Sequence, residues 1–364
     1  MDNIKVSIIT VCFNAQQTIE QTITSVLNQT YKNIEYIIVD GASTDSTCQI
    51  IGKYQSCINK VISEKDEGLY YAMNKGISYA KGDIIGIVNS DDIYAEDAIS
   101  KVVEYYQRTN ADIIYGNAMW FDEEKEIGIY RCDDIEELWY RMAIPHPATF
   151  VRAAVYKKYG RFNTKYPIAA DYELMLRFYC NHLKFGHIDE VITYFRTGGK
   201  SHQNQKSCIE DAKEIALYYI DQSNQKEYYL KKICDKYFKS YLGYFWRTDK
   251  KTIERAVSMI LNSHFVKEIA IFGTGKWGKQ MRSIIQNIDV KLEYFIDNDE
   301  AKQSRLVCGM VTKSPKFLKE YAGGVLIASS EHDDKIMEQI KKINNSLFIL
   351  TLSDIGRYIL CEHE

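Results

Sequence analysis

The sequence predicts an α/β protein made of two sheet-containing units. Short apolar runs alternate with amphipathic helical segments up to about residue 90, and the same alternation restarts at Lys267. The stretch between them is helical in pattern and has no proline and a single glycine from 206 to 262. A chain of 364 residues is also long for one domain. We therefore expect an α/β domain at 1–205, a helical connector at 206–262 and a smaller α/β domain at 263–364.

The elements of the first unit follow from the period of its apolar residues. Strands are expected at 6–11, 34–39, 61–62, 84–88, 112–116 and 191–196, and helices at 18–27, 46–54, 69–80 and 169–180. This alternation favours a mostly parallel sheet, in which ligands bind outside the carboxyl ends of the strands. Asp40 and the run Asn89-Ser90-Asp91-Asp92 follow two of those ends.

Composition excludes several classes of protein. A net charge of -3 lacks the basic excess of a nucleic-acid-binding protein. The nine cysteines are scattered without zinc-type spacing, which is typical of free thiols in a reducing compartment. No apolar run approaches the roughly 20 residues of a membrane span, and the first residues lead straight into a strand pattern, so we expect no signal peptide. A cytoplasmic location is expected, with a peripheral position on the inner face of the membrane as the alternative.

The adjacent carboxylates of Asp91 and Asp92 repel each other and therefore need a compensating cation. Oxygen ligands of this kind suit Mg²⁺ or Mn²⁺, which can bridge a diphosphate. The alternative is structural, because either residue could cap a helix that begins near Tyr94. The residues alone leave these two interpretations about equal.

Several segments taken together carry a family resemblance. They are Val6–Asn14, Ser25–Tyr31, Glu35–Asp45, Asp66–Gly76, Lys81–Asp83 and Asn89–Asp92. In this order they resemble family 2 of the inverting glycosyltransferases, over roughly residues 4 to 205. The resemblance implies the GT-A fold of a nucleotide-sugar transferase.

The resemblance also implies roles for the polar residues at the strand ends. Thr10 and Asn14 would line the floor of the nucleotide pocket. Asp40 would hydrogen-bond the uracil ring, and Asp66 would flank the base. Asp91 and Asp92 would form the metal-binding element, with Asp92 the expected direct ligand, although the first position of that element is Asn89 rather than aspartate.

The resemblance also implies a base for the inverting transfer. The segment Ile168–Arg177 resembles the catalytic segment of the family, which makes Asp171 the base that deprotonates the acceptor hydroxyl. Without the resemblance, a helix N-cap would be the favoured role for Asp171. Pro145–Arg152 resembles a segment near the acceptor site, where His146 either contacts the acceptor or only packs.

The family resemblance extends to a loop that closes on the diphosphate. Arg196 and Lys200 are expected in this lid, where a basic group would favour the leaving anion. His202 is a candidate metal ligand, and a solvent-facing histidine is the alternative. The connector carries many lysines and tyrosines between 226 and 251, which suits either helices packed between two domains or a basic surface that contacts a membrane.

The last unit contains a glycine-rich turn between a predicted strand and a predicted helix. Gly273, Gly275 and Gly278 have the spacing of a dinucleotide-binding turn, and Asp297 follows about 20 residues later. These residues form a candidate second nucleotide site, with NAD as a candidate cofactor. The unit resembles the Rossmann-like domains attached to sugar-modifying enzymes. A module that binds nothing and a scaffold for a partner enzyme stay open as alternatives, whereas redox catalysis is disfavoured because no lysine follows Tyr321 by four residues.

The combined hypothesis is an inverting, metal-dependent transferase. It would move a sugar from a nucleotide-sugar, expected to be UDP-linked, to a hydroxyl of a surface glycan or a lipid-linked oligosaccharide. The alternatives are a degenerate nucleotide-binding scaffold and a bifunctional enzyme with an NAD-binding second unit. The sequence does not specify the donor sugar, the acceptor, the linkage or the oligomeric state.

Overall fold

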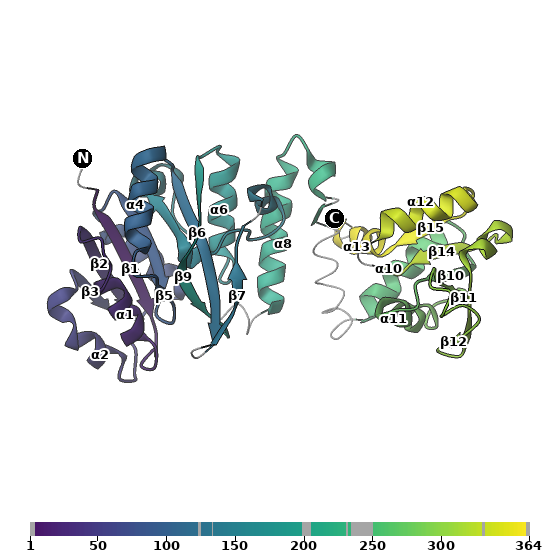
Figure 1. Cartoon of the computed structure of the whole chain (residues 1–364), viewed down its shortest axis with the longest axis horizontal. Helices are drawn as coiled ribbons and strands as arrows, with labels where there is room; N and C mark the ends of the chain where they lie inside the picture. Colours follow the sequence, from purple (N-terminus) through teal and green to yellow (C-terminus); the bar gives the residue numbers. More distant parts are fainter. Residues whose placement is uncertain are drawn as a thin grey trace. The chain divides into compact units, whose positions relative to one another are not determined.

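The computed structural model describes residues 4–122, 125–132, 134–198, 205–230, 232–233, 250–329 and 332–361. The chain divides into two compact units, Met1–Asn224 and Gln225–Glu364. Each unit is built on a sheet of its own (Figure 1).

The sheet of the first unit has a parallel half and a mixed half. Its strands are β1 (Val6–Cys12), β2 (Ile34–Asp40), β3 (Lys60–Ser63), β4 (Ile84–Asn89), β5 (Ile93–Tyr94), β6 (Ile113–Asp122), β7 (Lys125–Tyr130), β8 (Thr149–Arg152) and β9 (Phe185–Arg196). They lie in the order β3-β2-β1-β4-β8-β6-β9-β5, and β7 pairs with β6. Pairing from β3 to β4 is parallel, as the sequence predicts, whereas β8 runs antiparallel to both β4 and β6.

Helices cover this sheet. They are α1 (Ile19–Leu27), α2 (Thr47–Lys53), α3 (Leu69–Tyr79), α4 (Ala98–Thr109), α5 (Ala153–Tyr159), α6 (Ala170–Cys180) and α8 (Gln205–Asp221), with the short helices η1 (Gln55–Cys57), η2 (Ile135–Trp139) and η3 (His146–Ala148). The predicted helices of this unit all form, within two residues of the expected bounds. Helix α8, which the sequence analysis assigned to the connector, packs against α6.

The strand register places the polar residues of the sequence analysis at one edge of the sheet. Asp40 pairs with Cys12, and Asn89 pairs with Val11. Every residue of β1 is buried, because β1 lies between β2 and β4 and both of its faces are covered. The carboxyl ends of these three strands therefore meet beside one another.

The second unit contains a smaller and mainly parallel sheet. Its strands are β10 (Glu268–Phe272), β11 (Lys291–Ile296), β12 (Leu306–Val307), β13 (Met310–Lys313), β14 (Gly324–Ile327) and β15 (Ile349–Thr351), and its helices are α10 (Lys250–Ser263), α11 (Lys276–Ile285), η4 (Pro315–Glu320), α12 (Asp333–Ile343) and α13 (Leu352–Cys361). The strand order is β12-β13-β11-β10-β14-β15, and only β12 is antiparallel to its neighbour. The apolar runs at 267–272, 292–296, 325–328 and 347–350 predict four strands for this unit, and β10, β11, β14 and β15 are present at these places. Across the described residues of both units, no helix has the length and apolar character required to cross a membrane.

Candidate active site

The loop after β2 is organised by the buried side chain of Asp40. The hydroxyls of Ser43 and Ser63 donate to its two carboxylate oxygens at 2.5 and 2.6 Å, and the Cys48 thiol lies 3.3 Å from one of them. Burial alone would raise the pKa of Asp40, but hydrogen bonds from Ser43 and Ser63 hold it below its ordinary value. Asp40 has no exposed surface. The expected contact with a uracil ring is therefore not available to its side chain in this arrangement.

Thr10 and Asn14 support the same loop. Thr10 has no exposed surface, and its hydroxyl lies 3.0 Å from the hydroxyl of Tyr36 inside the unit. The expected place of Thr10 on the floor of a pocket does not agree with this burial. Asn14 is exposed with a left-handed backbone (φ 50°), and its amide oxygen accepts a hydrogen bond from the Thr44 N–H at 2.8 Å. Asn14 thus connects the end of β1 to the loop after β2.

A partly exposed carboxylate at this edge comes from the next loop. Asp66 lies directly over Gly41, so that a Cβ on Gly41 would be 2.9 Å from Asp66 Oδ2 and 3.5 Å from the ring of Phe13. Asp66 Oδ1 accepts a hydrogen bond from the Gly68 N–H at 3.0 Å. The Phe13 side chain is 60% exposed beside it. The absence of a side chain at Gly41 leaves the space that the Asp66 carboxylate occupies.

Asp91 and Asp92 differ sharply in their surroundings. Asp92 is fully buried, and its carboxylate accepts hydrogen bonds from the Arg196 N–H and the Asn89 side-chain amide, both at 3.1 Å. Asp91 is only partly buried, and no side chain of the described residues donates to its carboxylate. Burial raises the pKa of Asp91, and burial together with the charge of Asp91 raises the pKa of Asp92 well above its ordinary value. The charged form of the pair is therefore disfavoured unless a positive charge lies nearby.

The capping alternative for this pair does not hold. Ile93 and Tyr94 form strand β5 rather than the start of a helix. The next helix, α4, begins at Ala98, and Asp97 occupies its N-cap position. Neither carboxylate of the pair is therefore a helix cap.

Arg196 brings a positive charge next to the pair. Its Nε donates to the Asp91 carbonyl oxygen at 3.2 Å, and Nη2 donates to Gln21 at 2.8 Å. Its guanidinium also lies 4.4 Å from the ring centre of Phe121. The sequence contained no signal for Gln21 or Phe121, because both meet Arg196 only through the tertiary fold. Lys200 and His202 lie outside the described residues.

The residues around Asp91 fit a hard divalent cation. Asn89 Oδ1 is buried without a hydrogen-bond partner in the described part of the chain, and the Asp91 carboxylate lies two residues further on. The described residues contain no group of three or more His, Cys, Asp or Glu side chains that could hold a metal ion. A site with few protein oxygens suits Mg²⁺ or Mn²⁺, which keep water and phosphate ligands, better than zinc.

Asp171 lies in the first turn of α6 and is not its N-cap. That position belongs to Ala169, whose side chain cannot cap the helix. Asp171 Oδ1 instead accepts hydrogen bonds from the Tyr172 N–H at 2.9 Å and from the Tyr70 hydroxyl at 3.0 Å. Tyr70 belongs to the first turn of α3, directly after the loop that carries Asp66.

Aromatic rings join Asp171 to His146. The ring of Phe162 lies 5.5 Å from that of His146 and 5.2 Å from that of Tyr70. Burial lowers the pKa of His146, and the charge of nearby Asp171 acts in the opposite direction. The lowered pKa favours the neutral imidazole. The structure brings Asp171 and His146 together, and adds Tyr70 and Phe162, which the sequence analysis did not single out.

Comparison with known families decides what kind of domain holds this site. Residues 7–142 match the model of the family described as "Glycosyl transferase family 2". The chain carries a glycosyltransferase family 2 domain. An uncharacterized glycosyltransferase of Haemophilus influenzae is 27% identical over 244 residues, which are 59% of this chain and 74% of the relative. With the family match, this makes the chain a glycosyltransferase. Asp171, His146 and Arg196 lie beyond the matched range.

Solved structures confirm the fold of this glycosyltransferase. S. aureus TarS 1-349 in complex with UDP has a TM-score of 0.52 at 16% identity, over 72% of this chain and 78% of that one. The chain spans 43% of a longer TarS crystal chain. The mannosyltransferase PcManGT from Pyrobaculum calidifontis, in complex with GDP-Man and Mn²⁺, has a TM-score of 0.50 at 16% identity, over 63% of this chain and 68% of that one. At such identities the likeness shows the GT-A fold and no more.

The second unit of the glycosyltransferase matches the family described as "C2185-like, N-terminal" over residues 265–347. Its glycine-rich turn is explained by local packing. Gly273 has a positive φ of 107°, and a Cβ on Gly278 would lie 1.9 Å from the Gly273 carbonyl oxygen. Asp297 is buried and accepts hydrogen bonds from the N–H groups of Thr274 and Asp299, both at 3.0 Å. These contacts leave the Asp297 side chain 12% exposed, and the turn gives no support to NAD as a cofactor.

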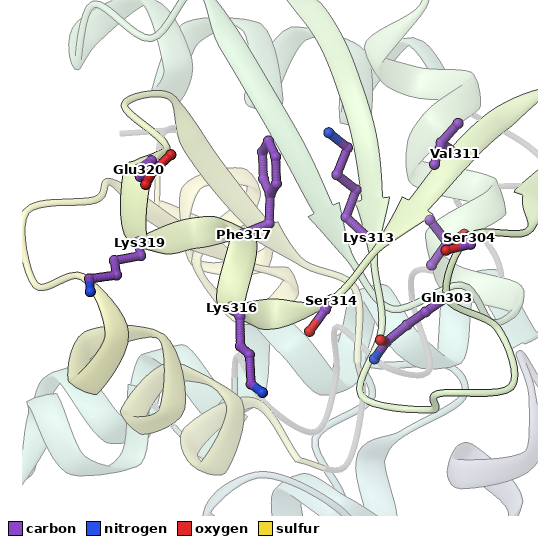
Figure 2. Close-up of a pocket in the computed structure, with 10 residues that line it drawn as sticks. Gln303, Ser304, Val311, Lys313, Ser314, Lys316, Phe317, Lys319 and Glu320 are labelled. Atoms are coloured by element: carbon purple, nitrogen blue, oxygen red, sulfur yellow. The ribbon is translucent and has the colours of Figure 1, made fainter.

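A cavity of about 520 Å³ lies elsewhere on the second unit, between β13, η4 and the residues before β12 (Figure 2). Its lining residues are Gln303, Ser304, Val311, Thr312, Lys313, Ser314, Lys316, Phe317, Lys319 and Glu320. The Lys313 ammonium lies 3.7 Å from the ring centre of Phe317, while Lys316 and Lys319 point away from each other in Figure 2. Three lysines and one glutamate give this cavity a positive charge, which favours an anionic ligand.

Proposed function

We propose that this glycosyltransferase moves a sugar from a nucleotide-sugar to a hydroxyl acceptor with inversion at the anomeric carbon. The observation that carries the proposal is the hydrogen bond from Tyr70 to Asp171. It joins the carboxylate at the start of α6 to the helix that follows the Asp66 loop, at the edge where the strand ends meet. A nucleotide pocket and a base for the acceptor thus belong to one connected site. The acceptor class remains the one expected from the family, a glycan or lipid-linked oligosaccharide.

Asp66 is the residue proposed to contact the base. A carboxylate accepts a hydrogen bond from the N3–H of uracil, whereas cytosine presents an acceptor at the same position. The exposed Phe13 ring beside it offers a surface for base stacking. We expect UDP to be the donor nucleotide, and the complexes of TarS with UDP and UDP-GlcNAc support this expectation. A GDP-sugar is the alternative, because guanine also presents N–H donors.

Asp91 is proposed as the direct ligand of a divalent cation, together with Asn89 Oδ1. This reverses the preference expected from the sequence, because both oxygens of Asp92 are already used and its side chain has no exposed surface. Asp92 would instead hold Asn89 and the end of β9 in place. The bound cation would supply charge neutralisation to the diphosphate leaving group, and the Arg196 guanidinium beside it would favour the same anion.

Asp171 is proposed as the base. Its Oδ1 is held by Tyr70 and Tyr172, which leaves Oδ2 to take the proton of the acceptor hydroxyl. The lowered pKa of His146 favours its neutral form, which can accept or donate a hydrogen bond to an acceptor hydroxyl.

Two measurements test the proposal on the whole chain. Thermal unfolding is followed with UDP, GDP, CDP and ADP, each with and without Mn²⁺, and a Mn²⁺-dependent shift with UDP is expected. The sugar released by slow hydrolysis of UDP-glucose or UDP-N-acetylglucosamine is then assigned by proton NMR, and the β-anomer is expected from an α-linked donor. Release of the α-anomer, or no shift with any nucleotide, would reject the proposed reaction.

The contact with the base has its own test. Asp66→Ala should weaken UDP binding by about tenfold or more, because a hydrogen bond to a charged group is lost. The neighbouring exposed Glu67→Ala is the matched control and should bind UDP as the wild type does. Equal UDP affinity in all three proteins, measured by calorimetry with Mn²⁺, would remove Asp66 from the pocket.

A further inference from the structure

Helix α8 is bound to the catalytic segment by more than apolar packing. Its buried residues Ala212, Ile215, Ala216 and Ile220 form one stripe with helical spacing. This helix packs against α6 and η2, and Figure 1 draws α8 and α6 in the same part of the first unit. Three polar side chains of α8 also reach the segment that leads into and through the start of α6.

The first of these contacts is at the N-terminus of α6. The Ile168 N–H donates to Asp211 Oδ2 at 3.3 Å, and the N–H of Ala169 also faces the Asp211 carboxylate. Ala169 is the N-cap residue of α6 and has no side chain that can cap the helix. A helix start carries partial positive charge and unsatisfied N–H groups, which a carboxylate satisfies well. Asp211 therefore supplies from α8 the anion that the local sequence does not provide.

The peptide unit next to the base is held from two sides. The Ile168 carbonyl oxygen accepts from the Tyr70 hydroxyl at 2.9 Å, while its N–H is held by Asp211. Ile168 is three residues before Asp171. Burial, and then the charge of Asp171, raise the pKa of the Cys208 thiol on α8 to about 11. The position of Asp171 thus depends on α3 and α8 together.

Two further polar contacts of α8 differ in their burial. The Tyr219 hydroxyl donates to the buried Glu173 at 2.8 Å. Glu214 pairs with Lys165 at 2.5 Å, but both of these side chains are more than half exposed. An exposed ion pair contributes little to stability, so Glu214 offers a control on the same helix face.

From these contacts we infer that Asp211 is a positioning residue for the transfer reaction, and that α8 is part of the catalytic unit rather than a connector. Asp211 fixes the turn at Ile168 and Ala169, and through it the direction of the Asp171 carboxylate. It touches neither donor nor acceptor. This inference rests on the proposed role of Asp171 as the base.

The test compares three variants of the whole chain by the release of UDP from a UDP-sugar. Asp211→Ala should lower kcat by about tenfold to a hundredfold, because a small displacement of a reacting group has effects of this size. The KM for the donor should stay within about twofold, since the nucleotide pocket is not touched. Asp211→Asn should recover most of the loss, because its amide oxygen can still accept from Ile168. Glu214→Ala should match the wild type.

Clear results would overturn the inference. A wild-type kcat in Asp211→Ala, or an equal loss in Glu214→Ala, would show that α8 does not position the base. A fall in the kcat of Asp211→Ala that is accompanied by a lowered melting temperature would indicate a purely structural role. If Asp211→Ala does not fold, Asp211→Asn provides the test. An inactive Asp211→Asn with an unchanged melting temperature would contradict the expected recovery. Asp171→Asn distinguishes failure of the proposed base from failure of the positioning role. Full turnover in Asp171→Asn rejects Asp171 as the base. An inactive Asp171→Asn together with a fully active Asp211→Ala rejects only the positioning role of Asp211.

Discussion

Each unit has an aspartate at the carboxyl end of a parallel strand, and each aspartate is turned inward. Asp40 ends β2 and is surrounded by hydroxyl donors, and Asp297 follows β11 and accepts from two backbone N–H groups. The two units differ in the charge of their other accessible side chains. In the first unit Asp66, Asp91 and Asp171 stay partly exposed, whereas the cavity of the second unit is lined by lysines. A strand-end position alone is therefore a poor guide to a ligand contact, and our proposal relies instead on the hydrogen-bonding capacity that each carboxylate keeps.

The largest effect is expected where a partly exposed carboxylate is proposed to do chemistry. Asp171→Asn should lower the rate of sugar transfer or donor hydrolysis by about 10³-fold, because the base is lost while the shape is kept. UDP affinity should be unchanged by calorimetry. Asp97→Asn, which alters a half-exposed carboxylate at the start of α4, is the control for a change of charge. A turnover in Asp171→Asn like that of this control would contradict the base assignment.

The next largest effect is expected at the proposed metal site of the first unit, and no effect is expected from a matched change in the second unit. Asp91→Ala should remove the Mn²⁺-dependent part of UDP binding, a loss of about a hundredfold in affinity, because Asp91 is the partly exposed carboxylate of the pair and Asp92 is buried. Asp299→Ala changes a carboxylate near the strand end of the second unit and should leave UDP binding unchanged. Calorimetry in Mn²⁺ and in EDTA measures both. Equal Mn²⁺ dependence in wild type and Asp91→Ala would rule out Asp91 as a ligand.

A smaller effect is expected in the glycine-rich turn of the second unit. Gly278→Ala should destabilise this unit by about 1–3 kcal/mol, because its Cβ would meet the Gly273 carbonyl oxygen at 1.9 Å. Gly275→Ala is the matched control, since nothing lies within 4 Å of a Cβ there. Denaturant unfolding measures both variants. If Gly275→Ala is the more damaging of the two, packing is the wrong explanation for these glycines.

The smallest effect concerns the dependence of stability on pH. The pKa of Asp40 is lowered in the folded chain, so its contribution is fully present above its ordinary pKa of about 4 and is lost as the pH falls below that value. The difference in melting temperature between wild type and Asp40→Asn should thus be largest near pH 7 and should shrink below pH 4. A difference that stays constant over this range would mean that the charge of Asp40 is not what holds the loop.

The sequence predicted the elements from β1 to β4 in order, because apolar periodicity reports which face of each segment is buried, but it did not predict β5, β7, β8, α4 or α5. It also located Asp40 and Asn89 at strand ends, and the register confirms this placement. The direction of a side chain at those ends could not be predicted, because it depends on partners distant in the chain. Ser63 is 23 residues from Asp40, and Tyr70 is 101 residues from Asp171. The roles of Lys200 and His202 stay predictions.

The hydroxyl of Tyr70 has one proton and two acceptors at similar distances. Asp171 Oδ1 lies at 3.0 Å and the Ile168 carbonyl oxygen at 2.9 Å. While Asp171 is ionised, the proton is drawn to the charged oxygen, because such a hydrogen bond is the stronger one. In the proposed reaction Asp171 takes a proton, after which the hydroxyl can rotate toward Ile168. The same rotation in reverse restores the starting state, so the proposed cycle requires a change in one torsion angle of Tyr70 and no movement of the helix.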